Sequence, residues 1–158
     1  MEQEQRSTLK VSKIRDGIVI DHIEPGRALK VLSTLGITGQ DGTTVSIIMN
    51  VKSKNPDTLK DIVKIENRVL KKKDLDKISL VSSDATINII ENYEITKKFK
   101  VEIPKMITGI LKCPNQNCIS NVKEPVQSEF KLESRKPVLI RCIYCDRTIS
   151  ESEIHTKF

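Results

Sequence analysis

Four cysteines in the last third of the chain constrain its fold more strongly than any other feature. They form two pairs, Cys113 with Cys118 and Cys142 with Cys145, and the sequence contains no further cysteine. In a reducing compartment, thiols clustered at short spacing bind a metal more often than they form disulfides. Four thiolates fill a tetrahedral zinc site completely. The sequence therefore predicts one structural Zn²⁺ per chain.

Three other interpretations of these cysteines remain open at this point. A catalytic metal would need a coordination position free for water, and four cysteine ligands provide none. Iron in a rubredoxin-like site suits the ligand type, although the spacing and the scarcity of aromatic residues do not favour it. Four unliganded cysteines in an ordinary core are the third interpretation. We favour zinc, because a domain of about 55 residues seldom folds on apolar burial alone.

The remaining composition is typical of a soluble cytoplasmic protein. Hydrophobic residues make up 37% of the chain and charged residues 30%, and there is no Trp. No apolar run approaches the roughly 20 residues that span a bilayer, and the opening stretch MEQEQRSTLK contains no apolar signal segment. We therefore expect a cytoplasmic location and no membrane partner.

The hydrophobic pattern that precedes the cysteines predicts an α+β fold. Period-2 and helical spacings alternate in the order strand, helix, strand, strand, helix, strand. This order predicts a mostly antiparallel sheet with two helices on one face, which is a ferredoxin-like arrangement. Pro25 is expected at the first position of the first helix, Gly36 at its end, and Lys71 to Lys73 in a solvated turn. The expected strands cover 9–14, 18–20, 45–51, 59–65, 87–90 and 93–101, and the helices cover 28–35 and 74–81.

Ile103-Pro104 marks the expected boundary between two domains, because proline interrupts a strand ladder and the sequence then changes character. We expect an N-terminal domain over residues 1–102. A small β-rich four-cysteine zinc domain is expected over residues 103–158. Within it, residues 129–133 and 138–141 are the expected hairpin that brings the two cysteine pairs together.

The net charge indicates a phosphate-rich partner. Lys and Arg number 27 against 21 Asp and Glu, which gives a net charge of +6 and a pI near 9.1. The charge is spread along the chain, and two Tyr and three Phe offer few platforms for stacked bases. A nucleotide is therefore favoured over nucleic acid, and a zinc-ribbon nucleic-acid-binding protein remains the alternative.

Polar side chains within the apolar strands are candidates for a nucleotide site. Asp21 and His22 follow one strand, Lys64 and Asn88 interrupt two others, and Lys97-Lys98 lie in the last. Such groups bind bases, sugars and phosphates. Each also has a purely structural explanation, since strand lysines often protect sheet edges, a histidine at a strand end is often a surface residue, and an asparagine can hold a backbone group.

Catalytic motifs are missing from the sequence. It contains no Gly-rich phosphate loop, no Ser/His/Asp or Cys/His set, and two histidines in total. We therefore expect a binding protein. A free-standing enzyme that uses Asp21 and His22 is the least favoured alternative.

With these residues in view, the sequence resembles the regulatory chain of aspartate carbamoyltransferase over nearly its whole length. The matching stretches are GIVIDHI, LKDIVKIEN, ATINIIENYE and CPNQNCIS at residues 17–23, 59–67, 85–94 and 113–120. The resemblance implies a noncatalytic chain that pairs with itself through its nucleotide domain and contacts the catalytic chain through its zinc domain. It also implies that CTP, UTP or ATP bound to this chain regulates pyrimidine biosynthesis allosterically.

The resemblance further implies three groups of site residues, each carried over by motif. His22 and Lys98 would contact the triphosphate, with Lys97 as the alternative to Lys98. Catalytic-chain contacts would come from Asn115, Asn117, Tyr144 and Arg147, and the metal ligands would be the four cysteines. The base and ribose would meet Val11, Ser12, Ile14, Val19, Asp21, Lys64, Asn88, Ile90, Tyr93 and Ile95.

Overall fold

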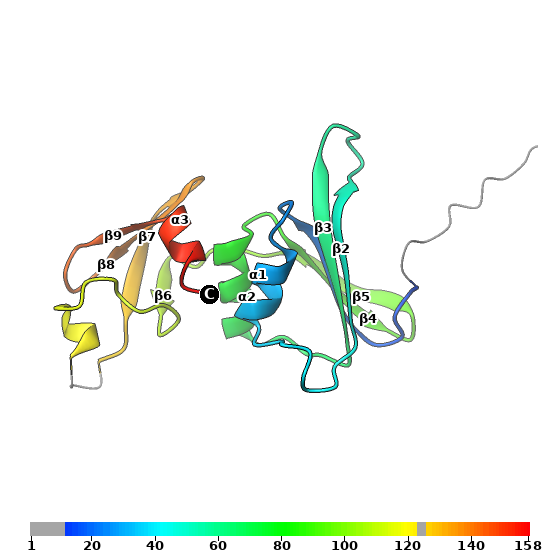
Figure 1. Cartoon of the computed structure of the whole chain (residues 1–158), viewed down its shortest axis with the longest axis horizontal. Coiled ribbons are helices and arrows are strands. Elements are labelled where there is room, and N and C mark those ends of the chain that lie inside the picture. Colours follow the sequence, from blue (N-terminus) through cyan, green and yellow to red (C-terminus); the bar gives the residue numbers. More distant parts are fainter. Residues whose placement is uncertain (1–11, 123–125) are drawn as a thin grey trace, which may run out of the picture.

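The structure is a computed structural model that describes residues 12–122 and 126–158. Figure 1 shows two β-sheets at opposite ends of the molecule, with helices between them. The first expected strand, over residues 9–14, begins outside the described residues. Its described part, Ser12 to Ile14, is not a strand.

The larger sheet has five strands in the order β2-β3-β1-β4-β5, and every pairing is antiparallel. Two helices cover one of its faces (Figure 1). These observations confirm the predicted α+β fold, and the hairpin strand β5 extends the ferredoxin-like order β2-β3-β1-β4. The elements are β1 (Gly17–Ile23), α1 (Ala28–Thr34), β2 (Val45–Lys52), β3 (Leu59–Glu66), α2 (Lys72–Val81), β4 (Thr86–Glu91) and β5 (Glu94–Lys100).

Side-chain alternation in the central strands builds the core between this sheet and its helices. The inward residues of β1, β3 and β4 are fully or almost fully buried against α1 and α2. Because successive side chains of a strand point to opposite faces, the residues between them face away from the helices. We call that second face the outer face of the sheet. The buried inward residues are Ile18, Ile20, Val63, Ile65 and Ile87.

Two local predictions in this half differ from the structure. Helix α1 begins at Ala28, so Pro25 lies in the preceding turn, whereas Gly36 ends the helix as expected with φ +70°. Lys71 does not belong to a turn, because it caps α2. Its backbone N–H donates to the Asp74 carboxylate at 2.9 Å, and Lys72 is already helical.

The smaller sheet has four antiparallel strands in the order β6-β7-β8-β9. The expected hairpin is present as β7 and β8. The shorter elements were not predicted from the sequence, because three to five residues are too few for a recognisable period. The elements are β6 (Met106–Thr108), the 3-10 helix η1 (Ile119–Asn121), β7 (Glu129–Arg135), β8 (Val138–Cys142), β9 (Thr148–Ser150) and α3 (Glu151–His155).

Asp61 is a fully buried carboxylate that organises the start of α1. One of its oxygens accepts hydrogen bonds from the backbone N–H groups of Gly26 at 2.8 Å and Ala28 at 3.1 Å, and the other accepts from Asn50 at 2.9 Å. Backbone donors near a helix start have no partner within the helix, so a buried acceptor is needed there. Asp61 therefore joins β3, β2 and α1.

We predict that Asp61→Ala lowers the free energy of unfolding by about 3 kcal/mol or more, because it removes the acceptor of three backbone donors. Urea denaturation followed by circular dichroism measures this loss. Asp57→Ala is the matched control, because Asp57 is exposed in the β2–β3 loop. Equal stability of the two variants would contradict the role of Asp61.

Candidate metal centre and outer-face cavity

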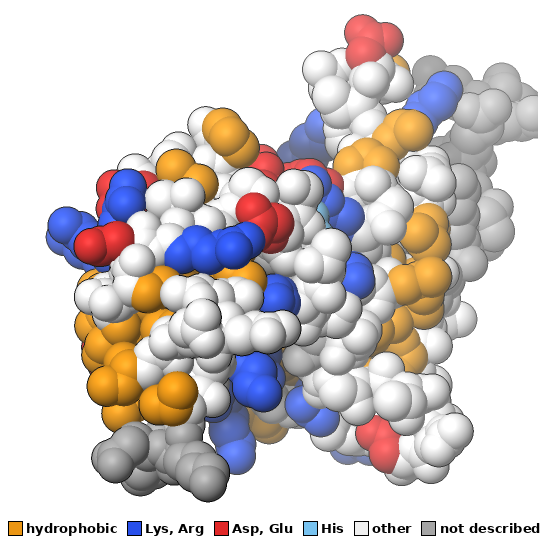
Figure 2. All heavy atoms as spheres, turned by 60° about the vertical axis from the view of Figure 1, so that its left-hand side comes forward, with side chains coloured by type: hydrophobic (Ala, Val, Ile, Leu, Met, Phe, Trp, Pro, Cys, Tyr) orange, Lys and Arg blue, Asp and Glu red, His pale blue; other side chains and the backbone are white. Residues whose placement is uncertain are grey.

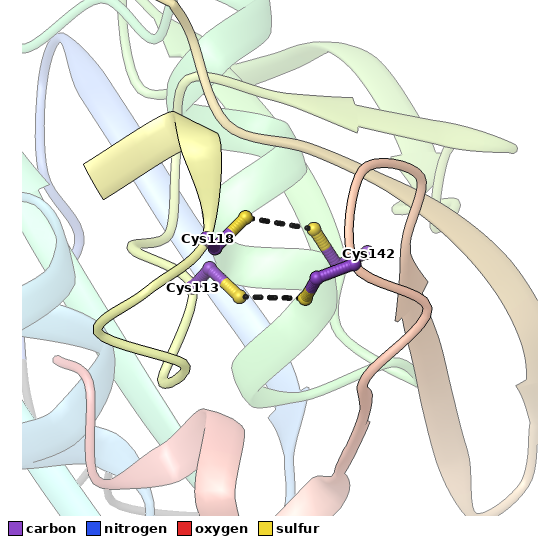
Figure 3. Close-up of side chains that lie close together, drawn as sticks. Cys113, Cys118 and Cys142 are labelled. Atoms are coloured by element: carbon purple, nitrogen blue, oxygen red, sulfur yellow. Dashed lines mark hydrogen bonds between the residues drawn. The ribbon is translucent and has the colours of Figure 1, made fainter. Parts of the chain in front are cut away.

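The four cysteines meet in one cluster, as the sequence predicted. All four sulfur atoms lie within 4.8 Å of one another, and the Cys113–Cys145 and Cys118–Cys142 sulfur pairs are each 3.6 Å apart. Figure 3 shows Cys113 and Cys118 approaching Cys142 from the opposite side of the cluster. Thiolates about 2.3 Å from a tetrahedral zinc lie about 3.8 Å apart, whereas a disulfide is about 2.05 Å long. The cluster therefore has the geometry of a metal site.

Two short loops place these ligands. In the first, the backbone N–H of Cys118 donates to the Asn115 carbonyl at 3.0 Å, and the Asn121 amide donates to the Cys113 carbonyl at 2.7 Å. In the second, the N–H of Asp146 donates to the Cys142 carbonyl at 3.0 Å, and Asp146 has φ +61°. Each loop is thus a tight turn held by local hydrogen bonds, which orient two sulfur atoms toward the other loop.

The cysteine environments differ in their preference for thiol or thiolate. Burial raises the pKa of Cys113 to about 12 and also raises the pKa of Cys142. Burial acts to raise the pKa of Cys145 too, but hydrogen bonds from the Arg147 backbone, the Asn115 side chain and the neighbouring cysteines outweigh it, so this pKa falls to about 7. A bound cation stabilises thiolates and therefore opposes the effect of burial on these cysteines.

The surface around the cluster carries the residues expected to contact a partner. Asn117 is exposed, Tyr144 is 40% exposed, and Arg147 forms an exposed ion pair with Glu153 at 3.3 Å. Asn115 is half-buried, and its side-chain oxygen accepts the Asn117 N–H at 3.0 Å. Asn115 therefore supports the loop more than it presents a surface.

Exposed apolar side chains around the cluster were missed by the sequence analysis. Ile119, Val122 and Ile143 are each more than 40% exposed. Figure 2 shows hydrophobic side chains gathered at this end of the molecule. The sequence held a usable signal, since Ile119 and Ile143 each directly follow a metal-ligand cysteine, where the backbone is fixed and the next side chain must point outward.

A row of four side chains, three of them polar, crosses the outer face of the larger sheet. Lys64 of β3 pairs with Val19 of β1, Val19 pairs with Asn88 of β4, and Asn88 pairs with Lys98 of β5. Directly paired residues of antiparallel strands share a face, so these four side chains lie side by side. Lys97 pairs with Ile89 and stacks on Phe99 at 5.4 Å. Lys97 therefore lies on the opposite face, with the helices.

A cavity of about 520 Å³ opens over part of this row. Six predicted residues line it, together with Lys13 and Glu94, which were not predicted. Ser12 is nearby, because its carbonyl accepts the Lys64 ammonium at 3.3 Å. Val11 lies outside the described residues. The predicted residues that line the cavity are Ile14, Val19, Lys64, Ile90, Tyr93 and Ile95.

Asp21 and His22 lie further along β1, beyond the residues that line the cavity. Asp21 forms an ion pair with Lys60 at 2.9 Å and accepts the backbone N–H of His22 at 2.6 Å. His22 has φ +55° at a break in the strand register, and its side chain is half-exposed. Lys60 was missed, although its period-2 spacing from Lys64 places both lysines on the outer face.

Asn88 is 6% exposed and donates a hydrogen bond from its amide to the Val19 carbonyl at 3.2 Å. This contact supports the structural explanation that Asn88 holds a backbone group. The side-chain oxygen of Asn88 is not needed for that bond, so it can accept a further donor.

In the described part of the chain, no helix is long and apolar enough to span a membrane.

Comparison with known proteins places both halves of the chain in one family. Residues 9–102 match the family described as the aspartate carbamoyltransferase regulatory chain, allosteric domain. Residues 105–155 match its metal binding domain. These two matches together span most of the described residues.

Several curated relatives named aspartate carbamoyltransferase regulatory chain cover almost the whole sequence. The relative from Thermoplasma volcanium is 55% identical over 95% of this chain and 98% of its own length. The Thermoplasma acidophilum relative is 52% identical over 94% of this chain and 98% of its own length. For Thermococcus kodakarensis the identity is 52%, over 92% of this chain and 95% of the relative. This chain therefore belongs to the aspartate carbamoyltransferase regulatory chain family, as a noncatalytic subunit with an allosteric domain and a metal-binding domain.

Proposed function

We propose that this chain binds CTP, UTP or ATP on the outer face of its larger sheet and transmits the binding to a catalytic chain docked on its metal-binding domain. The observation that carries the proposal is the cavity lined by apolar side chains and Lys64, on the same sheet face as Lys98. A nucleotide needs an apolar surface for its base and fixed cations for its phosphates. Family membership disfavours the zinc-ribbon nucleic-acid-binding alternative.

The cavity would hold the base end of a nucleotide, and the phosphate end would lie beyond it on the outer face. Ile14, Ile90 and Ile95 provide an apolar surface that suits a base. Lys64 borders this surface and is suited to the ribose or a base oxygen. The triphosphate then extends along the outer face toward His22 and Lys98, with Asp21 and Asn88 as polar contacts. Val11 and Ser12 complete the proposed set on the segment that precedes β1.

We predict that Lys64→Ala and Lys98→Ala each weaken CTP and ATP binding about tenfold or more, because each removes a charge-assisted contact. Titration calorimetry on the full chain measures the loss. Lys97→Ala is the matched control, since Lys97 lies on the same strand but on the opposite face. If Lys97→Ala weakened binding as much as Lys98→Ala, the phosphate site would be wrongly placed.

We infer that the metal is zinc and that its role is structural. Four cysteine ligands leave no coordination position for a substrate, and the sulfur separations suit zinc. Zinc can contribute roughly 10–16 kcal/mol to the folding of a small domain. We propose domains over residues 1–102 and 103–158, with the second one dependent on the metal.

The exposed residues around the cysteine cluster are the proposed docking surface for the catalytic chain. Tyr144 and Ile143 follow one metal ligand, and Ile119 follows another, so the metal fixes the positions of all three. Rigid aromatic and apolar anchors with a polar rim are typical of stable protein interfaces. Asn117 and Arg147 would form that rim.

We predict about one zinc per chain by elemental analysis, and loss of both zinc and catalytic-chain binding in Cys118→Ser. CTP binding persists in this variant, because the nucleotide cavity belongs to the other sheet. Gln116→Ala is the matched control, as an exposed residue between the same two ligands. Sedimentation of the mixed chains reports the complex. A metal-free Cys118→Ser chain that still formed it would contradict the docking role of the site.

The edge strand β2 is the proposed surface for self-association. Its Ile47 and Met49 side chains are each more than a third exposed, and β2 has an unpaired edge in the described structure. The opposite edge, β5, carries Lys97, Lys98 and Lys100, which discourage strand pairing. We therefore propose a regulatory dimer that pairs through β2.

We predict that Met49→Lys converts the dimer to a monomer, because it places a charge in an apolar contact. Thr96→Lys on the other edge strand is the control and leaves the dimer intact. Analytical ultracentrifugation distinguishes the two species, and circular dichroism confirms that both variants fold. Dissociation by Thr96→Lys alone would assign self-association to β5 instead.

A further inference from the structure

The two sheets are joined through a small contact between α2 and α3. Leu80 of α2 packs into the core of the smaller sheet, where Ile154 of α3 is fully buried. Two ion pairs also bridge the two halves. Arg27 approaches Glu151 at 3.7 Å, and Asp84 approaches Lys136 at 3.0 Å. These ion pairs can therefore change the strength of the contact between the two halves.

Asp84 differs from the other residues of these ion pairs because it holds two lysines from different halves. It lies in the connection between α2 and β4. One of its oxygens is 3.1 Å from the Lys100 ammonium at the end of β5 and 3.0 Å from the Lys136 ammonium in the β7–β8 turn. Hydrogen bonds from Lys136 and Lys100 lower the pKa of Asp84, so the carboxylate is ionised. A cleft of about 290 Å³ opens at this junction.

Lys100 connects this junction to the proposed nucleotide site. It pairs with Thr86 on β4, and Lys98 pairs with Asn88, so both lysines project from the outer face. Two residues along a strand span about 7 Å, which is within reach of a triphosphate held at Lys98. Lys100 can therefore bind either the Asp84 carboxylate or a phosphate oxygen.

We propose that Asp84 is a positioning residue that couples the nucleotide site to the metal-binding domain. A bound triphosphate draws Lys100 away from Asp84, and Asp84 then binds Lys136 more strongly, which tightens the contact between the halves. The inference rests on the proposed nucleotide-binding function. Because coupling between two sites is reciprocal, Lys136 must in turn affect nucleotide affinity through Asp84.

A double-mutant cycle on the full chain tests this coupling, with CTP and ATP affinities measured by calorimetry. The salt concentration is about 0.15 M, because exposed charges more than about 8 Å apart are then largely screened. Asp84→Asn frees Lys100 and is expected to tighten binding. Lys136→Gln leaves Asp84 to hold Lys100 alone and is expected to weaken it. Each change is about 1.5- to 5-fold, as for exposed ion pairs. In the Asp84→Asn background, Lys136→Gln has no effect.

Lys131→Gln on β7 is the matched control, because it removes the same charge from the same sheet at an exposed position. The coupling is overturned if Lys136→Gln still changes nucleotide affinity in the Asp84→Asn background. It is also overturned if Lys131→Gln changes the affinity as much as Lys136→Gln, because long-range charge alone then explains the effect. Unchanged affinity in Asp84→Asn overturns it as well. If the wild-type chain binds neither nucleotide, the proposed function itself fails, which is a distinguishable result.

Discussion

The division of the five-stranded sheet into two unlike faces is the constraint on which the rest of the structure depends. One face buries Ile20, Val63 and their neighbours under α1 and α2. Since side chains alternate, the sheet must present a second face. That face carries the polar residues Lys64, Asn88 and Lys98. The core and the proposed ligand surface are thus two consequences of a single strand pattern.

The metal-binding domain is subject to a different physical constraint, which is its small apolar core. A small four-stranded sheet with short elements buries limited apolar area, and a four-cysteine metal site compensates by fixing two loops at once. The same fixed loops carry the exposed apolar residues Ile119 and Ile143. In this domain, the feature that stabilises the fold also fixes the exposed surface that we propose for a partner.

The two halves are in contact through α2, which contributes to both cores. Leu80 packs with the smaller sheet, while Ile78 and Val81 pack with the larger one. A ligand on the outer face can influence a partner of the metal-binding domain only if it changes this shared contact. Asp84 lies where α2 leads into β4, so it is well placed for such an effect. The coupling free energy in regulated proteins of this kind is usually about 1–3 kcal/mol.

The sequence by itself determined the fold class, the clustering of the four cysteines and the polar strand residues Lys64, Asn88 and Lys98, because these depend on local periods and short spacings. The apolar residues that line the cavity were expected only from the family resemblance. Only the tertiary structure separated Lys98 from Lys97, since a bulge in the β4–β5 pairing decides which lysine shares a face with Asn88. It also revealed Lys60 beside Asp21 and Lys136 beside Asp84. These pairs join residues distant in sequence, and only the folded strands bring them within reach.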